Sequence, residues 1–277
     1  MPELPEVETI RRFLIKDIIG KKIKDVEIRV PKQFIGNPKT IIGQKIISID
    51  RKGKILCLKL KNNLYINFHL KLTGLLLFAK KQNLIFKNKI PFNRTNSLPG
   101  NTTRIILSFT DNSFLYFNDL RKFGWLKVTQ KPEIPKGIDI LSKYFDFQFV
   151  NSLIRKTSKS IKLLLMDQDK IAGIGNIYAN DALFLARIHP MKKSNMLTNT
   201  EIKNLYKKIL CVINEGLKYD GTSDEAYILP DSSIGKYQDH FKIYGREKLP
   251  CIRCQTPIKR VKHAGRSYFF CPSCQKL

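Results

Sequence analysis

Four cysteines close to the C-terminal end have the spacing of a zinc site. Cys251 and Cys254 form one Cys-x-x-Cys pair, and Cys271 and Cys274 form a second after sixteen intervening residues. Each pair can present two thiolates from one turn, and four thiolates complete the tetrahedral shell that Zn²⁺ prefers. Because such a shell leaves no open coordination position, the sequence predicts one structural zinc ion. The other two cysteines, Cys57 and Cys211, lie in apolar runs, and we expect both to be buried.

The residues that follow the initiator methionine could provide a nucleophile. Removal of Met1, which is common before a small residue, would leave Pro2 with a free secondary amine. An α-amino group titrates at about pH 8, well below lysine, so part of it is neutral and nucleophilic at neutral pH. Glu3, the next residue, could donate and accept protons beside it. An ordinary helix start would explain the same residues, so their role depends on the rest of the chain.

A glycine-rich turn, Gly173 to Tyr178 (GIGNIY), precedes an expected helix. Glycines allow a close approach to the backbone, and the first turn of a helix offers free N–H groups to a phosphate. The turn lacks the third glycine and the clear preceding strand of a dinucleotide-binding fingerprint. A phosphate contact and a purely structural turn both fit this pattern.

The composition of the chain indicates a polyanionic partner. The 277 residues include 50 Lys and Arg against 23 Asp and Glu, which gives a formal net charge of +27. Nucleic acid is the commonest partner of so basic a protein. No apolar stretch approaches the roughly 18 residues of a membrane span, and acidic residues occupy the start of the chain, where a signal peptide requires positive charge. We expect a soluble, cytoplasmic protein of about two domains.

The elements that must position these residues change in type along the chain. A short helix begins near Pro5, and short alternating strands continue to about residue 129, which is typical of a β-sandwich. Two prolines and a glycine then indicate a linker, helical patterns follow, and an aperiodic stretch precedes the cysteines. The predicted boundaries of this α+β, multi-domain chain are residues 1–130 for the β-sandwich domain, 131–143 for the linker, 144–220 for the helical domain, 221–248 for the loop region and 249–277 for the zinc finger.

The opening residues and five further motifs, in the same order, resemble those of the formamidopyrimidine-DNA glycosylases. They are Met1 to Glu8 (MPELPEVE), Arg51 to Lys54 (RKGK), His69 to Gly74 (HLKLTG), Asn118 to Gly124 (NDLRKFG), Met166 to Ala179 with its glycine-rich turn, and Lys262 to Lys276 in the cysteine module. The resemblance covers the whole chain. It implies an N-terminal β-sandwich with a leading helix, a helix–two-turn–helix domain and a C-terminal zinc finger.

This resemblance implies a base-excision-repair enzyme, a bifunctional DNA glycosylase and AP lyase that removes 8-oxoguanine and formamidopyrimidines from duplex DNA. In the family, the damaged nucleotide is flipped into a pocket between the two domains. Pro2 would attack the sugar C1′ and form a Schiff base, Glu3 would move protons at the sugar, and Glu6 would support this site. Lys54 would assist base release and β-elimination, and Arg266 would hold phosphates and assist δ-elimination.

The resemblance also implies the residues that contact DNA. Leu72, Arg121 and Phe123 would form a wedge that enters the space vacated by the lesion. Contacts with the DNA backbone would come from Lys159, Lys162, Asn176 and Thr102.

The chain departs from the family pattern at several positions. Leu72 replaces the usual wedge methionine. Leu120 replaces a proline of the loop Asn118 to Gly124, which carries Arg121 and Phe123 and is called the wedge loop below. Thr102 to Arg104 stand in place of His-Asp-His, and Asp224 to Ala226 occupy the loop that closes over the damaged base, where the family usually has a basic residue. These departures leave the lesion preference less defined than the chemistry.

Two other functions fit part of the sequence. An endonuclease VIII-like glycosylase would act on oxidised pyrimidines, although Leu4 and Val7 favour the purine branch. A non-catalytic zinc-ribbon protein that binds damaged DNA would share the charge and the zinc, but it would not need Pro2, Glu3 and Lys54 together. The resemblance favours an enzyme that acts as a monomer, away from membranes.

Overall fold

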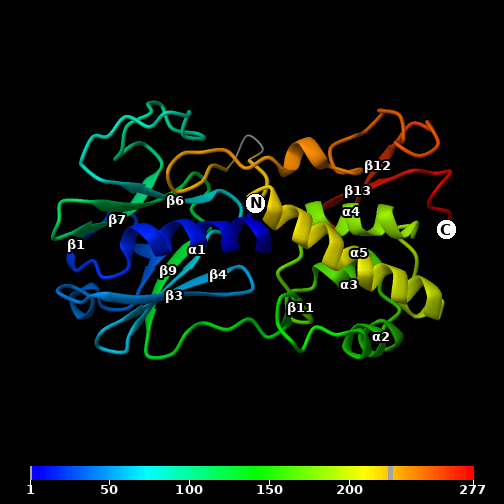
Figure 1. The fold of residues 1–277 in the computed structure, drawn as a ribbon, viewed down its shortest axis with the longest axis horizontal. Helices are drawn as coiled ribbons and strands as arrows, with labels where there is room; N and C mark the ends of the chain where they lie inside the picture. The colour runs from blue at the N-terminus through cyan, green and yellow to red at the C-terminus, as the bar shows by residue number, and fades with distance from the viewer. Residues whose placement is uncertain (1, 224–226) are drawn as a thin grey trace. The chain divides into compact units, whose positions relative to one another are not determined.

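A computed structural model describes residues 2–223 and 227–277, which form two compact units (Figure 1). The first unit contains Met1–Ile134 and Leu217–Gln238, and the second contains Pro135–Gly216 and Asp239–Leu277. Residues 217–238 therefore belong to the first unit, whereas the sequence predicted a separate loop region at 221–248. Asp224 to Ala226, at which the sequence departs from the family, lie outside the described residues.

The first unit contains two β-sheets, as the sequence predicted. Their neighbouring strands are antiparallel except for the parallel pair β2 and β9. One sheet has the order β1-β7-β8-β6 and the other the order β2-β9-β5-β4-β3. The strands of the first sheet are β1 (Ile23–Ile28), β7 (Thr103–Phe109), β8 (Phe114–Asp119) and β6 (Gly74–Ala79). Those of the second are β2 (Phe34–Ile35), β9 (Trp125–Thr129), β5 (Tyr65–His69), β4 (Ile55–Leu60) and β3 (Ile46–Lys52). Short 3₁₀ turns η1 (Pro31–Gln33) and η2 (Pro38–Thr40) flank β2.

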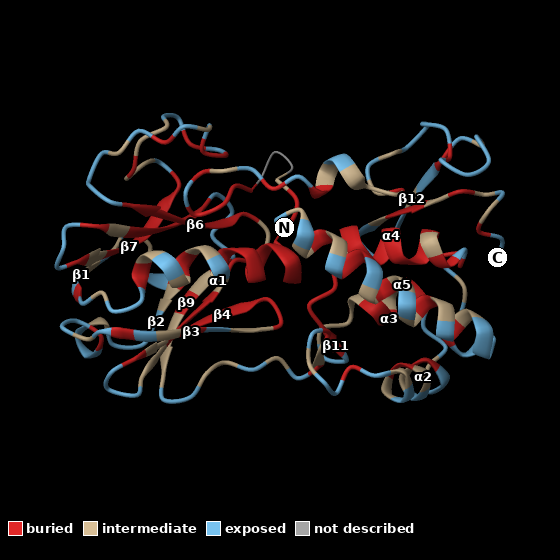
Figure 2. Cartoon of the chain, in the orientation of Figure 1, coloured by how far each residue is buried: buried red, intermediate tan, exposed pale blue. Residues whose placement is uncertain are grey.

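Helix α1 (Leu4–Ile18) joins the two sheets into one core. It packs against β3 and β4 of one sheet and β6 of the other. Val7, Ile10 and Leu14 recur at helical spacing, and all are at most 1% exposed within this core. Figure 2 shows that β4 and β6 are buried along almost their whole length, as strands between a helix and a partner sheet should be. Packing on this core therefore fixes the position of the N-terminal residues of α1.

A long connection between β6 and β7, residues 80–102, has a small core of its own. Phe86, Ile90 and Leu98 pack on Leu77 and Tyr116 of the first sheet, and Ile228 completes the cluster. We call this segment the β6–β7 loop. Its own apolar anchors explain why a connection of this length follows a defined path.

The second unit is helical and ends in a β-hairpin. Its helices are α2 (Phe147–Arg155), α3 (Ile161–Met166), α4 (Asn176–Ala186) and α5 (Asn199–Lys218), with 3₁₀ turns η3 (Ser194–Met196) and η4 (Tyr237–His240). Its strands are the parallel pair β10 (Ile138–Asp139) and β11 (Ile171–Ala172) and the antiparallel hairpin β12 (Lys259–His263) and β13 (Arg266–Phe270). Among the described residues, no helix combines the length and apolar character needed to cross a membrane.

The two isolated cysteines have different environments. Cys57 is buried, as predicted, and burial raises the pKa of its thiol to about 12. Cys211 is exposed, so the prediction for it was wrong. The buried face of α5 is formed by Leu205, Ile209 and Val212, and a residue at position 211 falls on the opposite side of the helix.

Candidate active site and DNA-contact residues

The proposed nucleophile lies at the buried start of α1. Pro2 is buried, and Glu3 and Glu6 are each only 1% exposed. Glu3 is the N-cap of the helix, and its backbone N–H donates to Glu6 Oε2 at 2.7 Å. This contact satisfies an N–H group that the helix start would otherwise leave unpaired. The predicted catalytic residues Pro2, Glu3 and Glu6 therefore share one rigid turn.

Glu6 also connects this turn to residues 217–238. Its Oε1 accepts a hydrogen bond from the Thr222 N–H at 2.8 Å, and its backbone carbonyl accepts one from the Tyr227 hydroxyl at 3.3 Å. Gly221 has a φ of +74°, and a Cβ there would lie 2.8 Å from Glu6 Oε1, so only glycine fits this position. The structure thus gives Glu6 a specific supporting contact that the sequence alone did not reveal.

Lys54 lies on the turn between β3 and β4. The preceding Gly53 has a φ of +59°, and Lys54 is 7% exposed. The guanidinium of Arg51 donates to the Gly53 carbonyl at 2.8 Å, which fixes the turn beside Lys54. The same guanidinium contacts Glu8 of α1 at 3.2 Å. One arginine therefore links the helix of Pro2 and Glu3 to the turn of Lys54.

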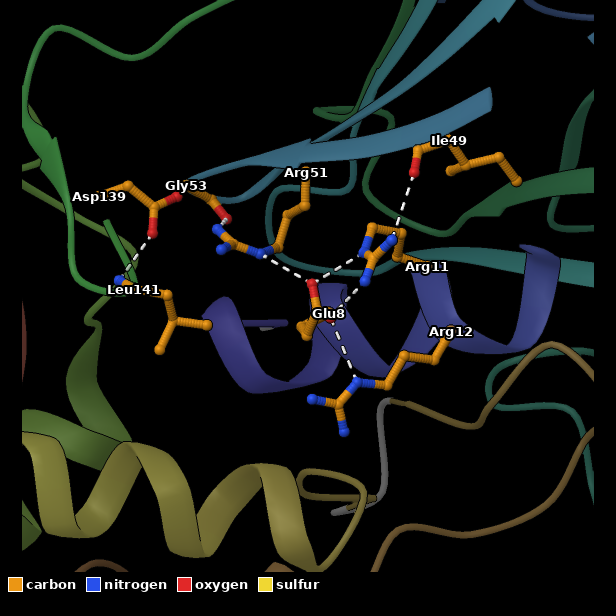
Figure 3. A network of polar contacts seen from close by, with 8 residues as sticks. All are labelled: Glu8, Arg11, Arg12, Ile49, Arg51, Gly53, Asp139 and Leu141. Carbon is orange, nitrogen blue, oxygen red and sulfur yellow. Dashed lines mark hydrogen bonds and ion pairs between the residues drawn. The ribbon is translucent and has the colours of Figure 1, made fainter. Parts of the chain in front are cut away.

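Three guanidinium groups surround the Glu8 carboxylate, as Figure 3 shows. Arg11 binds it with two hydrogen bonds of 3.0 and 2.8 Å, and Arg12 contacts it at 3.2 Å. Burial raises the pKa of the Glu8 carboxyl, but the hydrogen bond and charge of Arg11, together with the charge of Arg51, outweigh burial, so the pKa lies below its ordinary value. Glu8 is consequently ionised at neutral pH and holds its arginines in place.

His69 pairs with Ile55, the residue after Lys54, across β4 and β5. Burial and the positive charges of Lys71 and Lys54 lower the pKa of His69 to about 3. Its Nδ1 accepts a hydrogen bond from the Lys71 N–H at 3.0 Å. A neutral imidazole used in this way is a structural group, and we do not assign it a role in proton transfer.

The predicted wedge residues lie at one end of the first unit. Phe123 is 52% exposed, and the Arg121 guanidinium lies 4.8 Å from the centre of its ring. Leu72 is half-buried on the β5–β6 turn, and the hydroxyl of the next residue, Thr73, accepts the Arg121 N–H at 3.0 Å. An exposed aromatic ring covered by an arginine is suited to stacking on a nucleobase. The role of these three residues as a wedge stays a prediction.

Asp119 holds the wedge loop, a role that its position in the sequence did not reveal. This carboxylate is 1% exposed and accepts hydrogen bonds from the N–H groups of Arg121 at 3.2 Å and Gly124 at 2.8 Å. It also accepts hydrogen bonds from the side chains of Thr73 and Gln33. An acidic residue within a basic, polar turn is the signal that could have identified this anchor.

Thr102 does not have the environment of a DNA contact. It is 1% exposed, and its hydroxyl lies 3.5 Å from Asn93 Oδ1 within the first unit. The structure therefore does not support the prediction that Thr102 binds the DNA backbone. The Thr102 carbonyl also accepts the N–H of Asp119 at 2.9 Å, which holds the residue against β8.

In the second unit, Lys159 and Arg266 line one hollow. Its volume is about 340 Å³, and both side chains are exposed. Asn176, the first residue of α4, is half-buried. The two cations suit phosphate oxygens, and Asp167 lines the same hollow and pairs with Lys159 at 3.3 Å. The contacts of Lys159, Arg266 and Asn176 with DNA stay predictions.

Lys162 has a structural environment instead. It is 0% exposed, its ammonium donates to Asn180 Oδ1 at 3.1 Å and to the Ser267 carbonyl, and it lies 4.1 Å from the centre of the Tyr268 ring. These contacts join α3 and α4 to β13 of the hairpin. The prediction that Lys162 binds a phosphate is not supported, because its charge is used inside the unit. The resemblance supplied the residue and its expected role, and it could not show which side of the six-residue helix α3 is buried.

The four cysteines converge as the sequence predicted. All four Sγ atoms lie within 4.8 Å of one another, and the Cys254–Cys271 separation is 3.4 Å. Sulfurs in a tetrahedral zinc shell, with bonds of about 2.3 Å, are separated by about 3.8 Å, so the four residues fit the ion. Cys251 and Cys271 also pack on Phe184 of α4. A zinc ion held here would fix the hairpin, and with it Arg266, against the helical part of the unit.

Comparisons with known proteins agree with this arrangement. The formamidopyrimidine-DNA glycosylase N-terminal domain matches residues 1–126, the formamidopyrimidine-DNA glycosylase H2TH domain matches residues 137–227, and the zinc finger found in FPG and IleRS matches residues 248–277. The finger match and the clustered sulfurs together establish one structural Zn²⁺.

Individual relatives cover the whole chain. The formamidopyrimidine-DNA glycosylase of Listeria innocua serovar 6a is 35% identical over 100% of both chains, and that of Pelotomaculum thermopropionicum is 37% identical over 100% of both. The crystal structure of the MutM (FPG) protein from Thermus thermophilus has a TM-score of 0.86, with 35% identity over 99% of this chain and 98% of that one. The Lactococcus lactis Fpg in complex with DNA containing an abasic site has a TM-score of 0.84, with 30% identity over 99% and 100%. The chain belongs to the formamidopyrimidine-DNA glycosylase family.

Proposed function

We propose that this chain excises oxidised purines from duplex DNA with Pro2 as the nucleophile and then cleaves the strand at the resulting site. As a member of its family, it is a DNA glycosylase with AP lyase activity. The observation that carries the assignment of Pro2 is the buried start of α1, where Glu6 caps the turn and the Glu8–Arg51 contact links it to the turn of Lys54. A nucleophile and a proton-transfer group held on one rigid turn is the arrangement that covalent catalysis requires.

The proposed chemistry begins at the sugar of a flipped nucleotide. The neutral amine of Pro2 attacks C1′, the bond from C1′ to the base breaks, and the base leaves with the proton that the Pro2 nitrogen gives up. Glu3 then donates a proton to the ring oxygen, the sugar ring opens, and the bond between C1′ and the Pro2 nitrogen becomes an iminium.

Strand cleavage follows from this iminium. Because the iminium withdraws electrons, a proton can be removed from C2′ and the 3′ phosphate leaves by β-elimination; δ-elimination then releases the 5′ phosphate. Water hydrolyses the Schiff base and restores the amine. We assign Lys54 to assisting base release and β-elimination, and Arg266 to binding phosphates during δ-elimination.

The remaining contacts hold the DNA. Leu72, Arg121 and Phe123 would fill the space left by the flipped nucleotide, while Lys159 and Asn176 would bind backbone phosphates. Thr102 and Lys162 are left out of this set because both are buried. We further propose that the enzyme acts as a monomer in the cytoplasm, away from membranes, which sedimentation of the purified protein and fractionation of cells would test.

Borohydride trapping tests the proposed nucleophile. On a duplex with 8-oxoguanine, reduction should link the chain covalently to DNA, and digestion with mass spectrometry should place the adduct on the N-terminal peptide. A protein with one extra residue before Pro2 has an amide in place of the amine. It should give no adduct, and its affinity for lesion DNA should stay within about tenfold, or about 1.4 kcal/mol, of the wild type.

Other outcomes separate the alternatives. An adduct on Lys54 would overturn the role of Pro2. Faster excision of an oxidised pyrimidine than of 8-oxoguanine would favour the endonuclease VIII-like alternative. Tight binding of lesion DNA without excision or an adduct would favour a non-catalytic protein.

A further inference from the structure

The β6–β7 loop is strongly basic. Residues 80–101 contain no acidic side chain and five cations, all of them exposed: Lys80, Lys81, Lys87, Lys89 and Arg94. The loop is anchored by its own apolar cluster, so its cations are presented from a defined backbone. Such a surface attracts polyanions, and the two hollows that border the loop show which of its cations are best placed.

The two hollows differ in charge. One, of about 590 Å³, contains Lys80, Lys81 and Lys87, but also Asp17 and Asp231, which offset them. The other, of about 670 Å³, is lined by Lys89 and Arg94 together with amides, hydroxyls and apolar groups, and its described lining includes no acidic residue. Of these two hollows, the second has the lining in which the described residues include cations and no carboxylate.

Phe92 lies between the two cations of this second hollow. Its side chain is 41% exposed, and its φ is +61°, a region that bulky residues seldom adopt. The conformation directs the chain through a turn, and the Arg94 N–H that follows donates to Asn101 Oδ1 at 2.9 Å. An exposed aromatic ring beside cations is a common element of nucleic-acid surfaces.

A chain of hydrogen bonds connects this turn to the wedge loop. Asn101, which holds Arg94, accepts a hydrogen bond through its carbonyl from the Arg104 guanidinium at 3.1 Å. Arg104 also donates to the Asp119 carbonyl at 2.7 Å. The Asp119 carboxylate in turn binds the N–H of Arg121. Arg94 and the wedge are therefore anchored to the same end of the same sheet.

We propose that Lys89, Phe92 and Arg94 form a second DNA-contact surface, in which the two cations bind backbone phosphates next to the wedge. The proposal rests on the proposed function, because the wedge is what brings the duplex to this end of the sheet. Each strand of a duplex carries a phosphate about every 3.4 Å along its axis, so a basic turn tethered to the wedge loop meets several phosphates.

Equilibrium binding at several salt concentrations tests this surface. The ligand is a duplex with an uncleavable abasic-site analogue, and the test variant is Lys89→Gln/Arg94→Gln. Loss of two phosphate contacts should reduce the slope of log K against log salt by about 1.8, since each contact contributes about 0.9. The control, Lys80→Gln/Lys81→Gln, removes the same charge from the same loop beside Asp17 and Asp231, and it should leave the slope close to that of the wild type.

The possible outcomes decide between a local contact and a general effect of charge. A reduced slope in the test variant alone supports the proposal, provided that thermal unfolding shows both variants to be folded. Equal slopes in all three proteins, or equal reductions in both variants, would overturn it. Borohydride trapping with the wild type separates this result from the proposed function: trapping without the slope change rejects only the second surface, and the slope change without trapping rejects only the catalytic assignment.

Discussion

The Glu8 carboxylate and the Arg51 guanidinium lie 3.2 Å apart, although 43 residues separate them in the sequence. Their side chains are only 9% and 7% exposed. Glu8 belongs to the helix that begins at Pro2 and Glu3, and Arg51 holds the carbonyl before Lys54. The relative positions of the proposed nucleophile and the proposed lysine therefore depend on this buried ion pair.

Replacement of Glu8 should reduce both stability and turnover. Glu8→Gln keeps the shape of the side chain but loses charge-assisted hydrogen bonds, so we expect a loss of about 1.5 to 3 kcal/mol in the free energy of unfolding. Displacement of the Lys54 turn should lower kcat more than it changes KM, as single-turnover and steady-state assays on 8-oxoguanine DNA would show. Glu27→Gln is a suitable control, because Glu27 pairs with Arg29 at an exposed site.

The same carboxylate predicts a pH dependence of stability. Because the pKa of Glu8 is lower in the folded protein than its ordinary value of 4.5, its contribution is complete above that value and is lost as the pH falls through the folded pKa. The difference in Tm between the wild type and Glu8→Gln should therefore shrink on acidification below about pH 4.5. A difference that stayed constant from pH 7 to pH 3 would show that ionisation of Glu8 does not stabilise the fold.

Replacement of Asp119 should loosen the wedge loop. Asp119→Asn retains the volume of the side chain but cannot accept all the hydrogen bonds from Thr73, Arg121 and Gly124. We expect a loss of about 1.5 to 3 kcal/mol in stability and weaker binding of lesion DNA, measured by denaturation and by equilibrium titration. The exposed Asp169→Asn should change neither quantity. Unchanged affinity in Asp119→Asn would mean that the wedge loop does not need this anchor.

Two nearby lysines should separate stability from binding. Lys162→Ala removes a buried ammonium and the contacts that join α3 and α4 to β13, so it should destabilise the protein by about 2 to 4 kcal/mol. Lys159→Ala removes an exposed cation with one surface ion pair, so it should change stability by less than about 1 kcal/mol. It should instead reduce the salt slope of DNA binding by about 0.9. If Lys162→Ala reduced the salt slope and left stability unchanged, Lys162 would be a DNA contact after all.

Zinc removal should affect the hairpin before the rest of the chain. Metal analysis should find one zinc per chain, and chelation or Cys254→Ser should expose Phe269 and Cys271 of the small core next to α4. DNA affinity should fall because Arg266 is carried by the same hairpin. Cooperative unfolding of the first unit should persist. Purified protein without zinc, or chelation that left DNA affinity unchanged, would contradict this account.

Local patterns in the sequence determined much of this protein. The spacing of the four cysteines identified the zinc site, because two Cys-x-x-Cys turns need only one hairpin to bring their sulfurs together. Periodicity predicted short strands up to about residue 129 and helices after the proline-containing linker, and the structure has both. The opening motif predicted Pro2 and Glu3 as the nucleophile and its proton-transfer group, since that chemistry needs adjacent residues and a helix that begins beside them.

Tertiary structure decided the contacts that join distant segments. Glu8 and Arg51, Thr73 and Asp119, and Glu6 and Thr222 meet only because the sheets and α1 pack around one core. The direction of a side chain depends on the same packing, which is why Thr102, Lys162 and Cys211 differed from expectation. A residue type and its spacing specify which groups are available and the local element that carries them. Whether a charge is buried against a neighbouring element or presented to DNA depends on burial and hydrogen bonding with residues far away in the sequence.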